Sequence, residues 1–120
     1  GAFLLRAWAL ANGATLEAYM KAYVASLRRV LDPAHKEACV TLLMEKLDLS
    51  REVASAAYGQ LVEPGFGFQR DAKLDMSGIE SMLATRAETE GRALRLEDKS
   101  AYIDEAWHQR ALAALPANEC

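Results

Sequence analysis

The residues with the chemistry to catalyse a reaction or hold a metal are few, and their spacing does not assemble a site. The chain has two histidines, His35 and His108, and neither a His-x-x-x-His nor a Cys-x-x-Cys pair. A metal site needs more ligands at matched spacing, so both histidines are predicted to be structural or surface residues, and no metal or cofactor is expected. Cys39 lies in an apolar helical pattern and is predicted to be a buried free thiol, although a bridge to Cys120 stays open.

The hydroxyl and carboxyl groups give no catalytic constellation either. Four serines are candidate nucleophiles: Ser50, Ser55, Ser77 and Ser100. None stands in the glycine frame of a nucleophile elbow, so helix-capping or surface roles are predicted. The carboxylate pairs Asp71/Asp75 and Asp98/Asp104 have spacings that give no reason for convergence. The chain is therefore predicted not to be an enzyme, and no catalytic or ligand-binding residue is assigned.

The segment 63–75 is the one long stretch that does not fit a helix, and it contains Gly65-Phe66-Gly67-Phe68. It resembles a phosphate-binding loop only weakly, since it lacks the Lys-Ser/Thr pair and no strand precedes it. We predict instead a structural clasp in which Phe66 and Phe68 anchor the loop on a core. If the Phe68 ring is buried, Phe68→Ala should destabilise the fold by about 3–5 kcal/mol.

Apolar residues recur at helical spacing through the rest of the chain, so we predict an all-α fold of about six helices with no sheet. The expected helices cover 3–12, 15–31, 33–47, 51–62, 76–88 and 104–115. Their expected N-caps are Thr15, Asp32, Ser50, Asp75 and Asp104. A capping box of Ser77 with Glu80 is a rival start for the fifth helix. Asn12-Gly13 is predicted to end the first helix in a left-handed conformation.

Composition narrows the class of protein. The 120 residues suffice for one domain or part of one, and 52% are hydrophobic against 26% charged, which argues against disorder. The net charge of -3 and the lack of a basic cluster argue against nucleic-acid binding. Arg28-Arg29 is the only adjacent basic pair and is predicted to lie on a solvated helix face. Trp8 and Trp107 are predicted to be core or interface anchors. No apolar run approaches a membrane span.

Several phrases, taken in order, resemble the C-terminal third of bacterial periplasmic solute-binding proteins. The phrases are Arg6-Ala7-Trp8-Ala9, Ala11-Asn12, Tyr19 to Leu31, Asp32-Pro33-Ala34, Leu49-Ser50, Val53-Ala54, Gly67-Phe68-Gln69-Arg70-Asp71, Leu74-Asp75, Gly78-Ile79, Tyr102-Ile103-Asp104-Glu105 and Ala111-Leu112. The branch is the nitrate/sulfonate/taurine and thiamine-precursor-like group that serves ABC importers.

This resemblance implies that the chain is the C-terminal helical part of a type II periplasmic-binding-protein α/β fold. The whole protein would be periplasmic, with its signal peptide outside this chain, and would hand a small organic or anionic solute to an ABC permease. Ligand contacts would come from other parts of the protein, and only Phe3 to Arg6 would approach the cleft. Alternatives are a stand-alone helical interaction or regulatory domain, or a fragment of a pyrimidine-precursor-synthase-like enzyme. Because the apolar stripes exceed what the helices can bury themselves, the isolated chain is expected to self-associate.

Overall fold

Residues 3–91 and 103–115, which the computed structural model describes, form six α-helices and no strand, as the all-α prediction requires. The helices are α1 (Arg6–Ala11), α2 (Gly13–Leu31), α3 (Lys36–Leu47), α4 (Arg51–Leu61), α5 (Met76–Glu90) and α7 (Ala106–Ala113). Two short 3-10 helices, η1 (Pro33–His35) and η2 (Arg70–Ala72), lie between them. The first helix begins at Arg6, so the apolar residues Phe3, Leu4 and Leu5 precede it.

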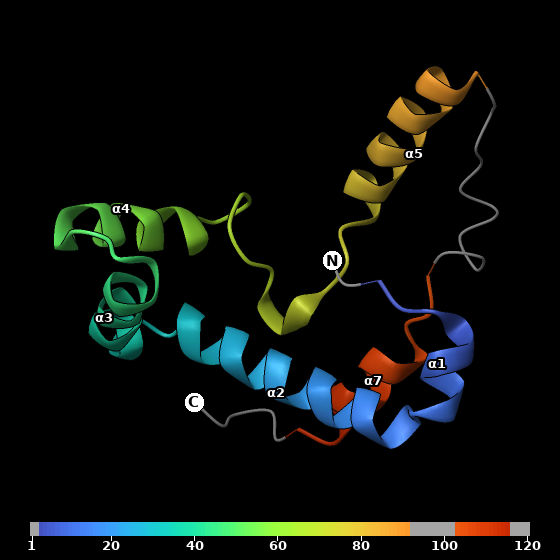
Figure 1. The fold of residues 1–120 in the computed structure, drawn as a ribbon, viewed down its shortest axis with the longest axis horizontal. Coiled ribbons are helices and arrows are strands. Elements are labelled where there is room, and N and C mark those ends of the chain that lie inside the picture. Colours follow the sequence, from blue (N-terminus) through green and yellow to red (C-terminus); the bar gives the residue numbers. More distant parts are fainter. Residues whose placement is uncertain (1–2, 92–102, 116–120) are drawn as a thin grey trace.

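The long helix α2 is the axis of the structure, with α1, α7 and η2 packed against it (Figure 1). Its buried residues include Leu16, Val24 and Leu27, while α7 contributes the buried Ala111. The contacting pair α3–α4 lies beyond the C-terminal end of α2, and α5 projects away on the other side (Figure 1). The radius of gyration is 17.2 Å, against about 14 Å for a compact domain of this length. The chain is therefore an open arrangement of helices.

Three of the helical segments begin where the sequence predicts a side-chain cap. Asp32 accepts a hydrogen bond from the Ala34 backbone N–H, Ser50 from Val53, and Asp75 from Ser77. The Ser77 hydroxyl donates to Asp75 Oδ1 at 2.7 Å, which favours Asp75 over Ser77 as the N-cap of α5. Local hydrogen bonding thus sets the residues at which η1, α4 and α5 begin.

The start of α2 differs from the prediction. Asn12 has a φ of −123°, and Gly13 is the first residue of α2, two residues before Thr15. The expectation that Asn12-Gly13 adopts a left-handed conformation is therefore wrong. Gly13 is needed for another reason, because a Cβ at this position would overlap the Trp107 ring and lie 2.7 Å from its Cζ3 atom. The glycine permits α7 to approach α2 closely.

The pair α3–α4 has a small core of its own. Val40, Ala54 and Tyr58 are buried together. Partly buried side chains surround them: Val30, Cys39, Leu43, Met44, Leu49 and Val62. Cys39 is a free thiol packed against this cluster, and Cys120 lies outside the described residues.

Helix α5 carries a stripe of hydroxyl side chains spaced four residues apart. The hydroxyls of Ser81, Thr85 and Thr89 each donate to the backbone carbonyl four residues earlier, at 3.0 Å. Such bonds satisfy the hydroxyl within the helix and slightly weaken or bend the helix. Leu83 is the buried residue of α5.

Candidate interaction surface

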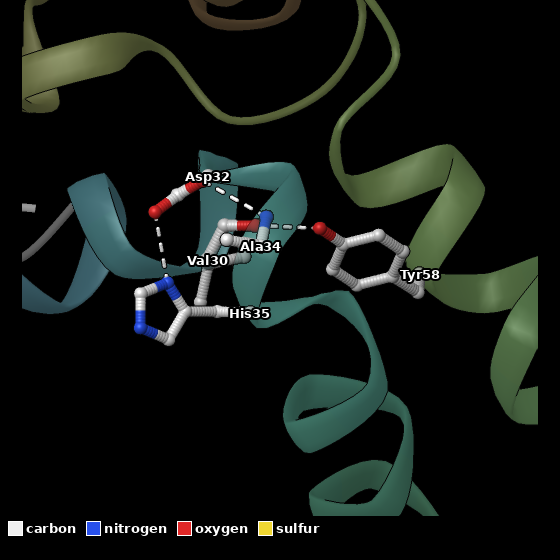
Figure 2. Close-up of polar contacts among 5 residues, drawn as sticks. All are labelled: Val30, Asp32, Ala34, His35 and Tyr58. Atoms are coloured by element: carbon white, nitrogen blue, oxygen red, sulfur yellow. Dashed lines mark hydrogen bonds and ion pairs between the residues drawn. The ribbon is translucent and has the colours of Figure 1, made fainter.

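The first histidine belongs to a junction between α2 and α3 rather than to a catalytic site. His35 Nδ1 lies 2.9 Å from Asp32 Oδ2, while the other carboxylate oxygen accepts from the Ala34 N–H at 2.9 Å (Figure 2). The Ala34 hydrogen bond is the main cause that lowers the pKa of Asp32, and the hydrogen bond and charge of His35 act in the same direction. His35 therefore supports the N-cap of η1.

The buried Tyr58 ties α4 to the end of α2 at the same junction. Its hydroxyl donates to the Val30 carbonyl oxygen at 2.8 Å (Figure 2). Burial raises the pKa of the Tyr58 phenol, since the apolar surroundings disfavour the phenolate. The hydroxyl thus satisfies a backbone acceptor, and the ring fills the α3–α4 core.

The second histidine is part of a junction that joins three segments far apart in the sequence. Arg28 Nε on α2 lies 2.5 Å from Asp71 Oδ1 in η2, and His108 Nε2 on α7 lies 2.6 Å from the Asp71 carbonyl oxygen. We call these three residues the Asp71 junction. Arg28 is 8% exposed, so the prediction that it lies on a solvated face is wrong. No local sequence pattern indicates this junction, because Arg28 and His108 lie 43 and 37 residues from Asp71.

The remaining candidate residues do not converge. Asp71 pairs with Arg28, whereas Asp75 caps α5. Ser50 and Ser77 are used at helix starts, and Ser55 is half-buried on α4. Asp98 and Ser100 lie outside the described residues. Within 3–91 and 103–115, no three His, Cys, Asp or Glu side chains are placed to hold a metal ion.

The predicted aromatic clasp is wrong. Phe66 is 93% exposed and Phe68 is 42% exposed, so neither ring is buried in a core. Backbone hydrogen bonds close the loop instead, from the Gly67 N–H to Glu63 and from the Phe68 N–H to Leu61, both at 2.7 Å. Gly67 is required there because a Cβ would overlap the Leu61 carbonyl group. A shallow groove open to solvent follows in the same segment, and one contiguous run of residues lines it: Gln69, Lys73, Leu74, Asp75, Met76 and Ser77.

Many large apolar side chains near the N-terminal end of the chain are exposed. Seven large residues of this region are exposed: Phe3, Leu4, Leu5, Trp8, Leu10, Tyr19 and Tyr23. Tyr19 and Tyr23 stack on each other on α2, with ring centroids 6.2 Å apart and planes 13° from parallel. At about 100° per residue, they lie beside the buried face that Leu16 and Leu27 form. The apolar arc of α2 is thus wider than the part that α7 and η2 cover.

Comparisons with protein-family models, curated proteins and solved structures found no match to this chain. No helix in the described ranges is long and apolar enough to cross a bilayer. The candidate functional feature is the set of exposed side chains of these seven residues, which we call the α1–α2 apolar surface. Aromatic residues are enriched in protein–protein interfaces relative to the rest of a protein surface.

Proposed function

We propose that this chain is the helical C-terminal part of a solute-binding protein of an ABC importer. In this proposal the α1–α2 apolar surface packs against a sheet of the same protein, and the chain contributes to solute binding without catalysing a reaction. The observation that carries the proposal is the exposure of Tyr19, Tyr23 and their neighbours beside a small buried core. The resemblance of the ordered sequence segments to periplasmic solute-binding proteins is the reason for proposing that the contacted surface is a sheet of the same protein.

The exposed apolar area in this region is substantial. A fully exposed large aromatic side chain offers about 150–250 Å², so the seven residues of the α1–α2 apolar surface, scaled by their exposed fractions, offer about 800 Å² in sum. One partner in a standard protein interface buries about 800 Å². Where such side chains are contiguous, a patch of several hundred Å² is usually a binding site.

The described polar groups are consistent with a binding role. His35 and Asp32 serve a cap, His108 and Asp71 join helices, and Asp75 starts α5. A solute-binding protein obtains affinity by closing two lobes around its ligand, so it needs rigid packing elements and no nucleophile.

The test compares two charge-introducing double variants in the full-length protein. Tyr19→Glu/Tyr23→Glu places two carboxylates on the α1–α2 apolar surface, whereas Ala18→Glu/Ala25→Glu places two on exposed positions elsewhere on the same helix. We expect the tyrosine variant to lower Tm by several degrees and to weaken solute binding, and the alanine variant to leave both nearly unchanged. Thermal-shift screening against nitrate, sulfonates, aromatic acids and pyrimidines identifies the solute class. Equal behaviour of the two variants, or no response to any of these solutes, would contradict the proposal.

The second candidate is a stand-alone helical interaction domain that binds a partner helix. The observation in its favour is that α3–α4 has its own core and caps, as a segment that folds locally would.

Light scattering on the isolated chain addresses both candidates. We expect self-association, because the α1–α2 apolar surface then lies in water. A chain that stays monomeric at high concentration, with the same helix content as at low concentration, would contradict the predicted self-association and favour the stand-alone domain.

A further inference from the structure

The segment 63–75, which we call the strap, contacts α2 through η2, and none of its residues is buried. Phe66 is 93% exposed, whereas Phe68 and Leu74 are 42% and 38% exposed. Even so, η2 packs against α2 (Figure 1). Burial of apolar side chains by the strap is therefore only partial, and polar contacts contribute to holding η2 on α2.

The strap also contains an unfavourable backbone conformation. Asp71 and Ala72 are consecutive residues with φ of 61° and 55°, in the left-handed region that non-glycine residues avoid. Asp tolerates this region better than most residues, whereas Ala has no side-chain group to stabilise it. Strained positions of this type persist only where surrounding contacts hold them.

The side-chain contacts that keep this strained backbone in place are made to Asp71. Its carboxylate pairs with Arg28 Nε at 2.5 Å, and its carbonyl oxygen lies 2.6 Å from His108 Nε2. A carbonyl can only accept, so His108 donates from Nε2. The Arg28 side chain is nearly buried, and a charge pair there is less screened by water and salt than one on the surface.

We infer that the strap is a two-state element latched on α2 by the Arg28–Asp71 pair, and that its opening also loosens α7. The coupling follows from the geometry of one residue. The left-handed conformation of Asp71 directs its carbonyl oxygen toward His108, so relaxation of the backbone breaks the bond to α7. Opening exposes the face of α2 that η2 and α7 cover and adds it to the surface available to a partner.

Amide hydrogen exchange of the full chain, residue by residue, tests the latch. Asp71→Asn removes the charge and keeps a residue that tolerates the left-handed conformation. We expect exchange of the Ala72 N–H, which is bonded to the Gln69 carbonyl at 3.1 Å, to accelerate at least tenfold. Amides of α7 should accelerate several-fold, and those around Val40 and Tyr58 in α3–α4 should not change.

A matched control and a reverse variant complete the test. Asp75→Asn makes the same substitution in the same loop, at the cap of α5, and should leave Ala72 exchange unchanged. Ala72→Gly relieves the strain and should slow exchange of the Lys73 N–H several-fold. Equal effects of Asp71→Asn and Asp75→Asn at Ala72 would overturn the latch. Faster exchange throughout α3–α4 in Asp71→Asn would also overturn the latch, because the opening would then be global. Unchanged or faster exchange of the Lys73 N–H in Ala72→Gly would overturn the role of backbone strain.

Discussion

The α3–α4 pair and the α2-centred unit are held together in different ways. In α3–α4 the contacts are between sequence neighbours, a buried cluster of Val40, Ala54 and Tyr58 fills the interface, and Ser50 caps the second helix. In the α2-centred unit, Arg28 and His108 reach Asp71 across 43 and 37 residues, and large aromatic side chains remain exposed. The first region forms its core from local residues, although Leu42, Leu47 and Val53 remain exposed on it, whereas the second depends on distant contacts and leaves more large apolar side chains exposed.

This difference suggests where each region obtains its stability. The α3–α4 pair has a local core of its own, and it supports the end of α2 through the Tyr58–Val30 hydrogen bond. A region with an incomplete core gains free energy by binding, because binding removes its apolar surface from water. The proposed interaction surface and the strap both belong to the second region.

The largest expected effect is in the α3–α4 core. Tyr58→Ala removes a ring that is 5% exposed and should lower the free energy of unfolding by about 3–5 kcal/mol. Tyr58→Phe keeps the ring and loses only the hydrogen bond to Val30, so it should cost about 1–2 kcal/mol. Urea denaturation followed by circular dichroism measures both. A cost for Tyr58→Ala below that of Tyr58→Phe would show that the α3–α4 cluster is not a core.

A smaller effect is expected where α7 meets the start of α2. Gly13→Ala places a methyl group inside the Trp107 ring and should destabilise the fold by about 1–3 kcal/mol. Gly59→Ala is the matched control, because Gly59 lies in α4 with no atom within 4 Å of the added Cβ. That control should stabilise the fold by about 0.5–1 kcal/mol, as alanine favours a helix interior. Stabilisation by both substitutions would exclude the close approach of Trp107.

The loop phenylalanines should have still smaller effects. With Phe68 at 42% exposure, Phe68→Ala should cost about 1–2 kcal/mol rather than the value for a buried ring. Phe66→Ala should stay within about 0.5 kcal/mol of the parent, since that ring is exposed. Thermal unfolding of the two variants in parallel makes the comparison. A cost of about 3 kcal/mol or more for Phe68→Ala would restore the clasp.

Acid should produce the smallest effect. Hydrogen bonds lower the pKa of Asp32 and of Asp75 below the ordinary value of 3.8 in the folded chain. A carboxyl with a depressed folded pKa stabilises the fold fully above its unfolded pKa, and this stability disappears as pH falls through the folded pKa. The contribution should therefore be constant at neutral pH and decline below 3.8. Melting temperatures measured across that range should fall less in Asp32→Asn/Asp75→Asn than in the parent, and parallel curves would contradict this linkage.

The sequence predicts the local parts of this structure and misses the distant ones. Asp32, Ser50 and Asp75 act through backbone groups within three residues, so residue type and spacing were sufficient. The helix stop at Asn12-Gly13 is confirmed, because α1 ends at Ala11, but its left-handed conformation is not. The packing role of Gly13 was missed because the residue that requires it, Trp107, is far along the chain. The buried Arg28 was missed for the same reason, since no pattern in α2 reveals that Asp71 will lie beside it.

The hydroxyl stripe of α5 has a consequence for the kind of surface that this helix can meet. In sequence the four residues read as polar, yet Ser77 donates to Asp75 and the other three hydroxyls donate to carbonyls of their own helix. All four hydroxyl donors therefore have acceptors within α5 or at its N-cap. An apolar neighbour could therefore lie along this stripe without stranding a hydroxyl donor. In contact, this stripe of α5 would behave as a small-residue surface whose hydroxyl donors are already satisfied.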